Sequence, residues 1–212
     1  MGDKTELFPR PKTKQELQAL LMDDNVIPNN IDTSLIEDMS ELFKDNKTFN
    51  KPINKWNTTN VTNMRGMFSG ATSFNQKIVV KSQEPFILGI LLMGYKGNGK
   101  KLPVVILKRI SKYVIETGWD TSRVINMDTM FYKATSFNQP VGGLNTHKVI
   151  RMRGMFCGAT SFNQPVEGLN TSQVANMDSM FSGATSFNQP VEGWNTSQVA
   201  NMDDMFNGAK AF

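Results

Sequence analysis

The sequence has one cysteine, one histidine and no long apolar run among its 212 residues. A single cysteine, Cys157, excludes a disulfide within the chain and a cysteine-cluster metal site. The longest apolar run, residues 86–93, is far short of the roughly 20 residues that a membrane-spanning helix needs. The first residues form no apolar secretory segment. These absences predict a protein without a membrane span in a reducing compartment, cytoplasmic or part of a virion, and disfavour the cell surface.

Net charge is also small, at +4. Residues 79–116 account for all of it, with seven basic and two acidic side chains, whereas the rest of the chain is close to neutral. Most of the chain therefore lacks the basic stripe that nucleic-acid-binding proteins carry. The sequence predicts no nucleic-acid partner.

What the sequence does have is a 25-residue unit that occurs six times. The anchor methionines of units one to six are Met39, Met64, Met127, Met152, Met177 and Met202. Every step is 25 residues except the step from unit two to unit three, which is 63 residues long and so holds 38 extra residues. A unit of this length buries its apolar face only by stacking on a neighbour. We expect an α/β repeat solenoid.

Each unit is expected to contain one short helix and one or two short strands. The unit opens with Asp or Asn followed by Thr, which favours a tight turn. In unit three, Met127, Met130, Phe131 and Ala134 have the i, i+3, i+4, i+7 spacing of one helix face. The closing Phe-Asn-Gln-Pro-Val predicts a short extended segment, because proline disfavours helix in the residue before it.

The repeat also predicts which side chains are buried. The structural core is expected to include Met127, Met130, Phe131, Phe137, Met152, Met155, Phe156, Phe162, Met177, Met180, Phe181 and Phe187. A buried column of stacked asparagines is expected at Asn50, Asn75, Asn138, Asn163 and Asn188. A further column is interpreted as surface charge, at Arg65, Asp128, Arg153, Asp178 and Asp203.

The chain divides into four parts on this basis. Residues 1–30 form an N-terminal cap, whose Thr13 and Glu16 fit a capping box before a helix with Leu17, Leu20 and Leu21. Residues 31–78 hold units one and two. Residues 79–116 are a basic and apolar insertion, expected to form a lobe. Residues 117–212 hold units three to six, of which the last is truncated.

The repeated units resemble a known family. Residues 194–209, Trp-Asn-Thr-Ser-Gln-Val-Ala-Asn-Met-Asp-Asp-Met-Phe-Asn-Gly-Ala, are similar to the unit of BspA-like and mycoplasma-lipoprotein repeats, and residues 31–43 resemble that family's first unit. The resemblance covers about 150 residues. It implies a leucine-rich-repeat-like fold, found on bacterial surfaces and in some large viruses and protists, and a role in adhesion or interaction.

Three interpretations of the insertion stay open. Gly94, Gly99 and Lys100 match a phosphate-binding loop, but Lys101 stands where a magnesium-binding Ser or Thr belongs. Residues 102–114 resemble the first helix of an F-box, the motif of ubiquitin-ligase adaptors. The third interpretation, which is favoured, is a packed hairpin or strand-plus-helix lobe with a lysine-rich turn.

The repeated polar residues are Thr, Asn and Gln, which do not titrate near neutral pH. His147 replaces a turn serine, so the sequence predicts no catalytic, cofactor-binding or metal-binding residue. We expect a non-enzymatic scaffold for protein–protein interaction or assembly, acting on a protein partner or by self-association through an uncapped C-terminal end. An F-box-like adaptor is the alternative, and a nucleotide-binding switch is less favoured. Candidate partner contacts are Lys96, Lys100, Lys101, Met205, Phe206 and Phe212.

Overall fold

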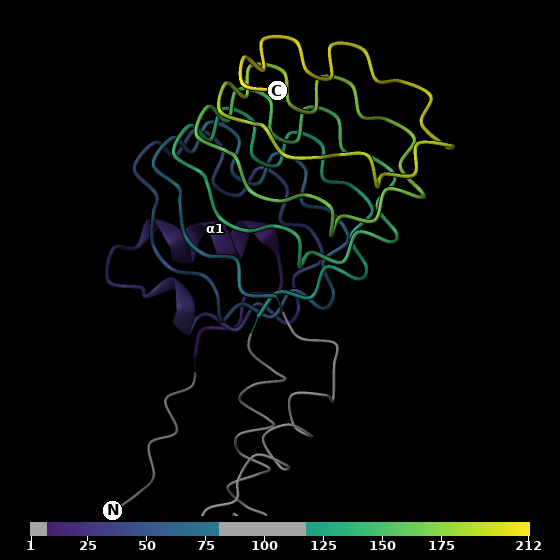
Figure 1. Cartoon of the computed structure of the whole chain (residues 1–212). Coiled ribbons are helices and arrows are strands. Elements are labelled where there is room, and N and C mark those ends of the chain that lie inside the picture. The colour runs from purple at the N-terminus through teal and green to yellow at the C-terminus, as the bar shows by residue number, and fades with distance from the viewer. Residues whose placement is uncertain (1–7, 81–117) are drawn as a thin grey trace, which may run out of the picture.

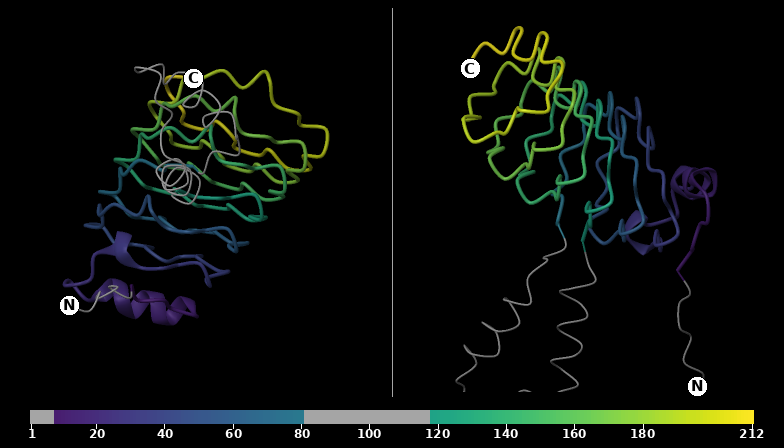
Figure 2. Two further views of the ribbon diagram at one scale, coloured as in Figure 1. Left: turned by 90° about the horizontal axis from the view of Figure 1, so that it is seen from below. Right: turned by 90° about the vertical axis from the view of Figure 1, so that its right-hand side faces the viewer.

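A computed structural model of the chain describes residues 8–80 and 118–212. The six units lie one upon another in a single stack, with the first unit at one end and the sixth at the other (Figures 1 and 2). Unit two lies directly on unit three, because Asn63 forms a parallel bridge with Asn126. The amide of Trp119 donates to the carbonyl of Val79 at 2.7 Å, so the chain leaves and re-enters the stack at one corner.

Helix α1, Lys14–Met22, covers the outer side of unit one (Figure 2). The N-cap half of its predicted capping box is confirmed, since the Glu16 amide donates to the Thr13 hydroxyl at 3.1 Å. The Glu16 carboxylate accepts the amide of Lys12 at 2.7 Å and not that of Thr13. Leu17 is completely buried against the stack. A short 3-10 helix, η1, Pro28–Asn30, leads from the cap into the first unit.

The predicted fold class, an α/β leucine-rich-repeat-like solenoid, is wrong. Within residues 8–80 and 118–212, α1 is the only α-helix and there is no strand, so no unit contains the expected helix or strands. Neighbouring units instead share isolated parallel bridges in the column Asp38, Asn63, Asn126, Arg151, Asn176 and Asn201, and a further bridge joins Val80 to Trp119.

The segment predicted as a helix is a run of tight turns. In unit four the Met155 amide donates to the Met152 carbonyl at 3.2 Å, which is an i+3 turn bond. The amides of Gly154, Phe156 and Gly158 instead donate to carbonyl groups of unit five at 2.7–2.9 Å. Gly154 and Gly158 have φ of 56° and 70°, left-handed values that glycine adopts without the usual steric cost. Bonds between units thus replace the i+4 bonds of a helix.

Residues in the left-handed conformation also prevent the formation of strands. Left-handed residues recur two and six positions after each anchor methionine, and they bend the chain away from the extended form that a continuous ladder needs. Only glycine takes this conformation freely, yet six other residues hold it: Glu41, Asp45, Thr129, Lys133, Ser179 and Asp204.

The core is a pair of phenylalanine columns that run the length of the stack. Within a unit the two rings lie 3.8–4.0 Å apart, as for Phe156 and Phe162. Between units the rings lie 5.4–6.1 Å apart, as for Phe156 and Phe181. All twelve residues expected in the core have no exposed surface. Such ring pairs add stabilisation of about 0.5–1.5 kcal/mol each beyond the burial of their area.

Candidate interaction surfaces

In units one to five, the opening turn holds a threonine that links the unit to the next one. The Thr146 hydroxyl, which is buried, donates to the Asn170 carbonyl at 2.9 Å, and Thr171 donates to the Asn195 carbonyl at 3.0 Å. The Asx turns predicted here are confirmed, since the side-chain oxygen of Asn170 accepts the amide of Ser172 at 3.0 Å. This corner is occupied by structural bonds.

The asparagine column stacks from unit to unit but lies toward solvent. The Asn138 side-chain oxygen accepts the Asn163 amide at 2.9 Å and the Gln164 amide group at 3.0 Å. The same pair of bonds recurs along the column. Asn50, Asn75 and Asn188 are exposed, and Asn138 and Asn163 are half-buried. The expectation that this column is buried is therefore wrong, because the side-chain oxygens accept backbone amides at the solvent-facing edge of each unit.

The column interpreted as surface charge contains one buried member. Asp128 is only 4% exposed. Its carboxylate accepts the Arg153 amide at 2.8 Å and lies 2.9 Å from Nε of Arg151. In most units the Asp or Asn at the bridge position accepts the amide of the residue two positions later, as Asn176 does from Asp178 at 2.9 Å. Unit four has Arg151 at this position, and the carboxylate of unit three replaces the missing acceptor.

A basic and apolar face covers units three and four, and the sequence analysis missed it. It consists of Arg123, Ile125, Lys148, Ile150, Arg151 and Arg153, which we call the basic-isoleucine face. Both isoleucines are 47% exposed. The other units have Glu37, Thr62, Ala175 and Ala200 at the position of these isoleucines. The signal in the sequence was that two adjacent units carry isoleucine where the others do not.

The outer side of unit six exposes apolar side chains. Phe212 is 51% exposed and Met202 is 44% exposed, whereas Met205 and Phe206 are partly buried against the core. The amides of Met202, Asp204, Phe206 and Gly208 correspond to those that join the other units. They donate to no backbone carbonyl within the described parts of the chain.

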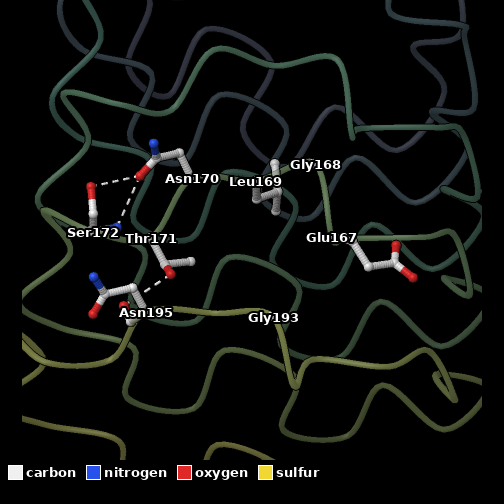
Figure 3. Close-up of a pocket in the computed structure, with 8 residues that line it drawn as sticks. All are labelled: Glu167, Gly168, Leu169, Asn170, Thr171, Ser172, Gly193 and Asn195. Carbon is white, nitrogen blue, oxygen red and sulfur yellow. Dashed lines mark hydrogen bonds between the residues drawn. The ribbon is translucent and has the colours of Figure 1, made fainter.

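A shallow hollow of about 350 Å³ lies where the opening corners of units five and six meet (Figure 3). Its polar groups are engaged with one another: Thr171 donates to the Asn195 carbonyl, and the Ser172 hydroxyl donates to the Asn170 oxygen at 2.7 Å. Glu167 is the one ionisable residue in its lining. This hollow lacks converging groups for catalysis.

Lys96, Lys100 and Lys101, the phosphate-loop match and the F-box-like segment lie outside the described residues. His147 is exposed, and its ring contacts the Asn145 side chain. Burial raises the pKa of the Cys157 thiol. Within residues 8–80 and 118–212 there is no group of three or more His, Cys, Asp or Glu residues placed to bind a metal.

In the same described ranges, no helix has the length and apolar character needed to cross a membrane. The chain belongs to the DUF285 family, described as Mycoplasma protein of unknown function, whose model matches residues 15–82 and 107–212. The unmatched residues 83–106 fall inside the predicted insertion. Searches of curated proteins and of solved structures found no match.

Proposed function

We propose that this chain is a non-enzymatic scaffold that binds other proteins and assembles through the stacked repeats. The observation that carries the proposal is the difference between the buried and the exposed positions of each unit. Buried residues and the bonds between units recur almost unchanged, whereas exposed positions differ between units. A stack of this kind offers a long surface on which separate sites can be varied independently.

The resemblance to BspA-like and mycoplasma-lipoprotein repeats supports the same proposal, because it implies adhesion or interaction. The repeated polar side chains are Thr, Asn and Gln, which do not titrate near neutral pH. These features favour recognition over catalysis.

Assembly is proposed to involve the outer side of unit six. Met202 and Phe212 expose apolar surface there, which can pack against the same surface of a second copy. At the opposite end, α1 covers unit one and buries Leu17 against it, and the apolar side chains exposed there, Phe8, Met22 and Ile27, belong to the cap. The proposed contact is therefore between two unit-six faces in a two-fold pair.

The test is the molecular mass of the full chain in sedimentation experiments over a range of concentrations. Wild type should associate as concentration rises, and Met202→Lys should shift it toward monomer. Met22→Lys is the matched control, because Met22 is 84% exposed at the opposite end of the stack. A wild-type chain that stays monomeric, or equal effects of the two substitutions, would contradict assembly through this face.

A further inference from the structure

We propose that the basic-isoleucine face of units three and four binds an acidic protein segment that also carries apolar side chains. The inference deepens the proposed scaffold role by naming a site and the chemistry of its partner. It begins with where the units differ. Units five and six share Thr-Ser-Gln-Val-Ala-Asn-Met-Asp at their opening, whereas unit four reads Thr-His-Lys-Val-Ile-Arg-Met-Arg.

The differences in unit four are confined to the outside. Thr146, Val149 and Met152 are buried and match their counterparts in units five and six. Lys148, Ile150, Arg151 and Arg153 occupy exposed positions. Packing therefore does not explain why this unit departs from its neighbours.

Arg151 lacks the hydrogen-bond acceptor that its position in the fold requires. The bridge position needs a side-chain oxygen to accept the amide two residues later, and arginine has no acceptor. The buried Asp128 of unit three provides the oxygen instead and also pairs with Nε of Arg151. The stack thus holds a cation at a position where asparagine would satisfy the backbone by itself.

The face keeps a positive character despite these ion pairs. Arg151 and Arg153 pair through Nε with Asp128 and Asp178, and their side chains remain 58% and 62% exposed. Lys148 forms no ion pair within the described residues, and Arg123 donates to the neutral oxygen of Asn60 at 2.9 Å.

The neighbouring units limit where an acidic partner can bind. Asp203 and Asp204 lie in unit six, and Glu37 lies in unit one. Repulsion by these carboxylates would direct negative charge toward the middle of the stack.

Ile125 and Ile150 decide between classes of partner. Two half-exposed isoleucines in adjacent units offer an apolar contact about one side chain wide, which suits a Leu, Ile or Phe between acidic residues. Single-stranded nucleic acid would instead require exposed aromatic rings for base stacking. The exposed aromatic residues within the described ranges, Phe8 and Phe212, lie at the two ends of the chain and not on this face.

The experiment selects binders from a random library of displayed 12-residue peptides, using the full chain as bait. The enriched peptides should be net negative and contain apolar residues. A fluorescein-labelled copy of the most enriched peptide then gives dissociation constants by anisotropy. Lys148→Glu should weaken its binding about tenfold or more, because like charges would face each other. Ile150→Ala, which restores the residue of units five and six, should weaken it several-fold.

Gln198→Glu is the matched control, since residue 198 occupies the position of Lys148 in unit six. It should leave the affinity within about twofold, and far-ultraviolet circular dichroism should be unchanged in all three variants. Raising the salt concentration should weaken binding of wild type.

The proposal would be overturned by neutral or basic enriched peptides, by no enrichment, or by equal effects of Lys148→Glu and Gln198→Glu. Stronger binding of a uridine homopolymer that displaces the peptide would instead identify a nucleic-acid surface. None of these outcomes would affect assembly through unit six, which sedimentation measures separately.

Discussion

Replacing Gly168 by alanine tests whether the units touch at backbone level. Gly168 lies at the corner where unit four passes into unit five. A Cβ atom there would lie 2.9 Å from both Cα and the carbonyl carbon of Gly142 in the unit before, and it would also meet the Gly142 oxygen. Backbone atoms cannot turn aside as a flexible side chain can, so the two units would have to separate locally.

The expected cost follows from the kind of contact. Overpacking a closely packed site costs roughly 1–3 kcal/mol. Because all three contacted atoms belong to the main chain, we expect Gly168→Ala to lower the free energy of unfolding by about 3 kcal/mol, at the upper end of this range. Gly168 does not have a positive φ, so steric contact is the source of the effect.

Gly193 provides an internal control, since it holds the same position one unit later and nothing lies within 4 Å of its added Cβ. Gly193→Ala should change stability by less than about 0.5 kcal/mol, as surface substitutions do. Urea unfolding followed by tryptophan fluorescence measures both, and Trp194 reports locally because its indole N–H donates to the Val166 carbonyl at 3.2 Å. Equal midpoints for wild type and Gly168→Ala, or equal losses for the two variants, would refute the reasoning.

Three other substitutions test particular contacts. Asp128→Ala should cost roughly 1–3 kcal/mol in urea unfolding by leaving the Arg153 amide without its acceptor, and Arg151→Asn in the same chain should recover most of this loss; no recovery would show that the two sites are not coupled. Burial alone would raise the pKa of Asp38, but hydrogen bonds from Ser40 and the charge of Lys14 hold this pKa below its usual value. The carboxylate therefore stabilises the fold above about pH 4 and loses this effect as pH falls through the folded-state pKa. Asp38→Asn should reduce the fall of the melting temperature at acid pH; an unchanged fall would exclude Asp38 as its source. Thr129→Gly should stabilise the chain by about 0.5–1 kcal/mol, since a β-branched residue is strained at φ of 53°; a loss in the melting experiment would show that the threonine side chain contributes more than its strain.

The repeat period predicted the long-range order but not the local backbone. The anchor methionines placed unit two against unit three across the insertion, and the Asn63–Asn126 bridge agrees with this order. The Thr13 capping box located α1 because local hydrogen bonds determine where that helix begins. These features depend on residues that act alone or at a fixed spacing, so they can be derived from one sequence.

The helix prediction failed because the i, i+3, i+4, i+7 pattern fits more than one backbone. Overlapping i+3 turns bring the same methionines and phenylalanines to one side. The contrary signal was Gly154 and Gly158, which are spaced like the left-handed positions and would each cost about 1 kcal/mol inside a helix. Non-glycine residues such as Thr129 and Lys133 at the same positions in unit three masked this signal.

The candidate surface was missed for a related reason. Asp128 was interpreted as surface charge because its column is charged in several units. Its burial depends on Arg151, which comes 23 positions later and removes an acceptor in the next unit. Such a dependence becomes visible only when both the unit interface and the missing hydrogen bond are known.

The bonds between units also make the stack electrically polar. The amides of Met39, Glu41, Phe43 and Asp45 all donate to backbone carbonyls of unit two, whereas one amide of unit two, that of Thr62, donates to a backbone carbonyl of unit one. Peptide dipoles aligned in this way add along the axis, as they do in a helix, with positive N–H ends toward unit six and negative C=O ends toward unit one. Two features fit this polarity: Nζ of Lys14 lies 3.0 Å from the outward carbonyl of Ser40, and Asp203 and Asp204 lie in unit six. The two ends of the stack therefore favour opposite charges, whatever binds along its length.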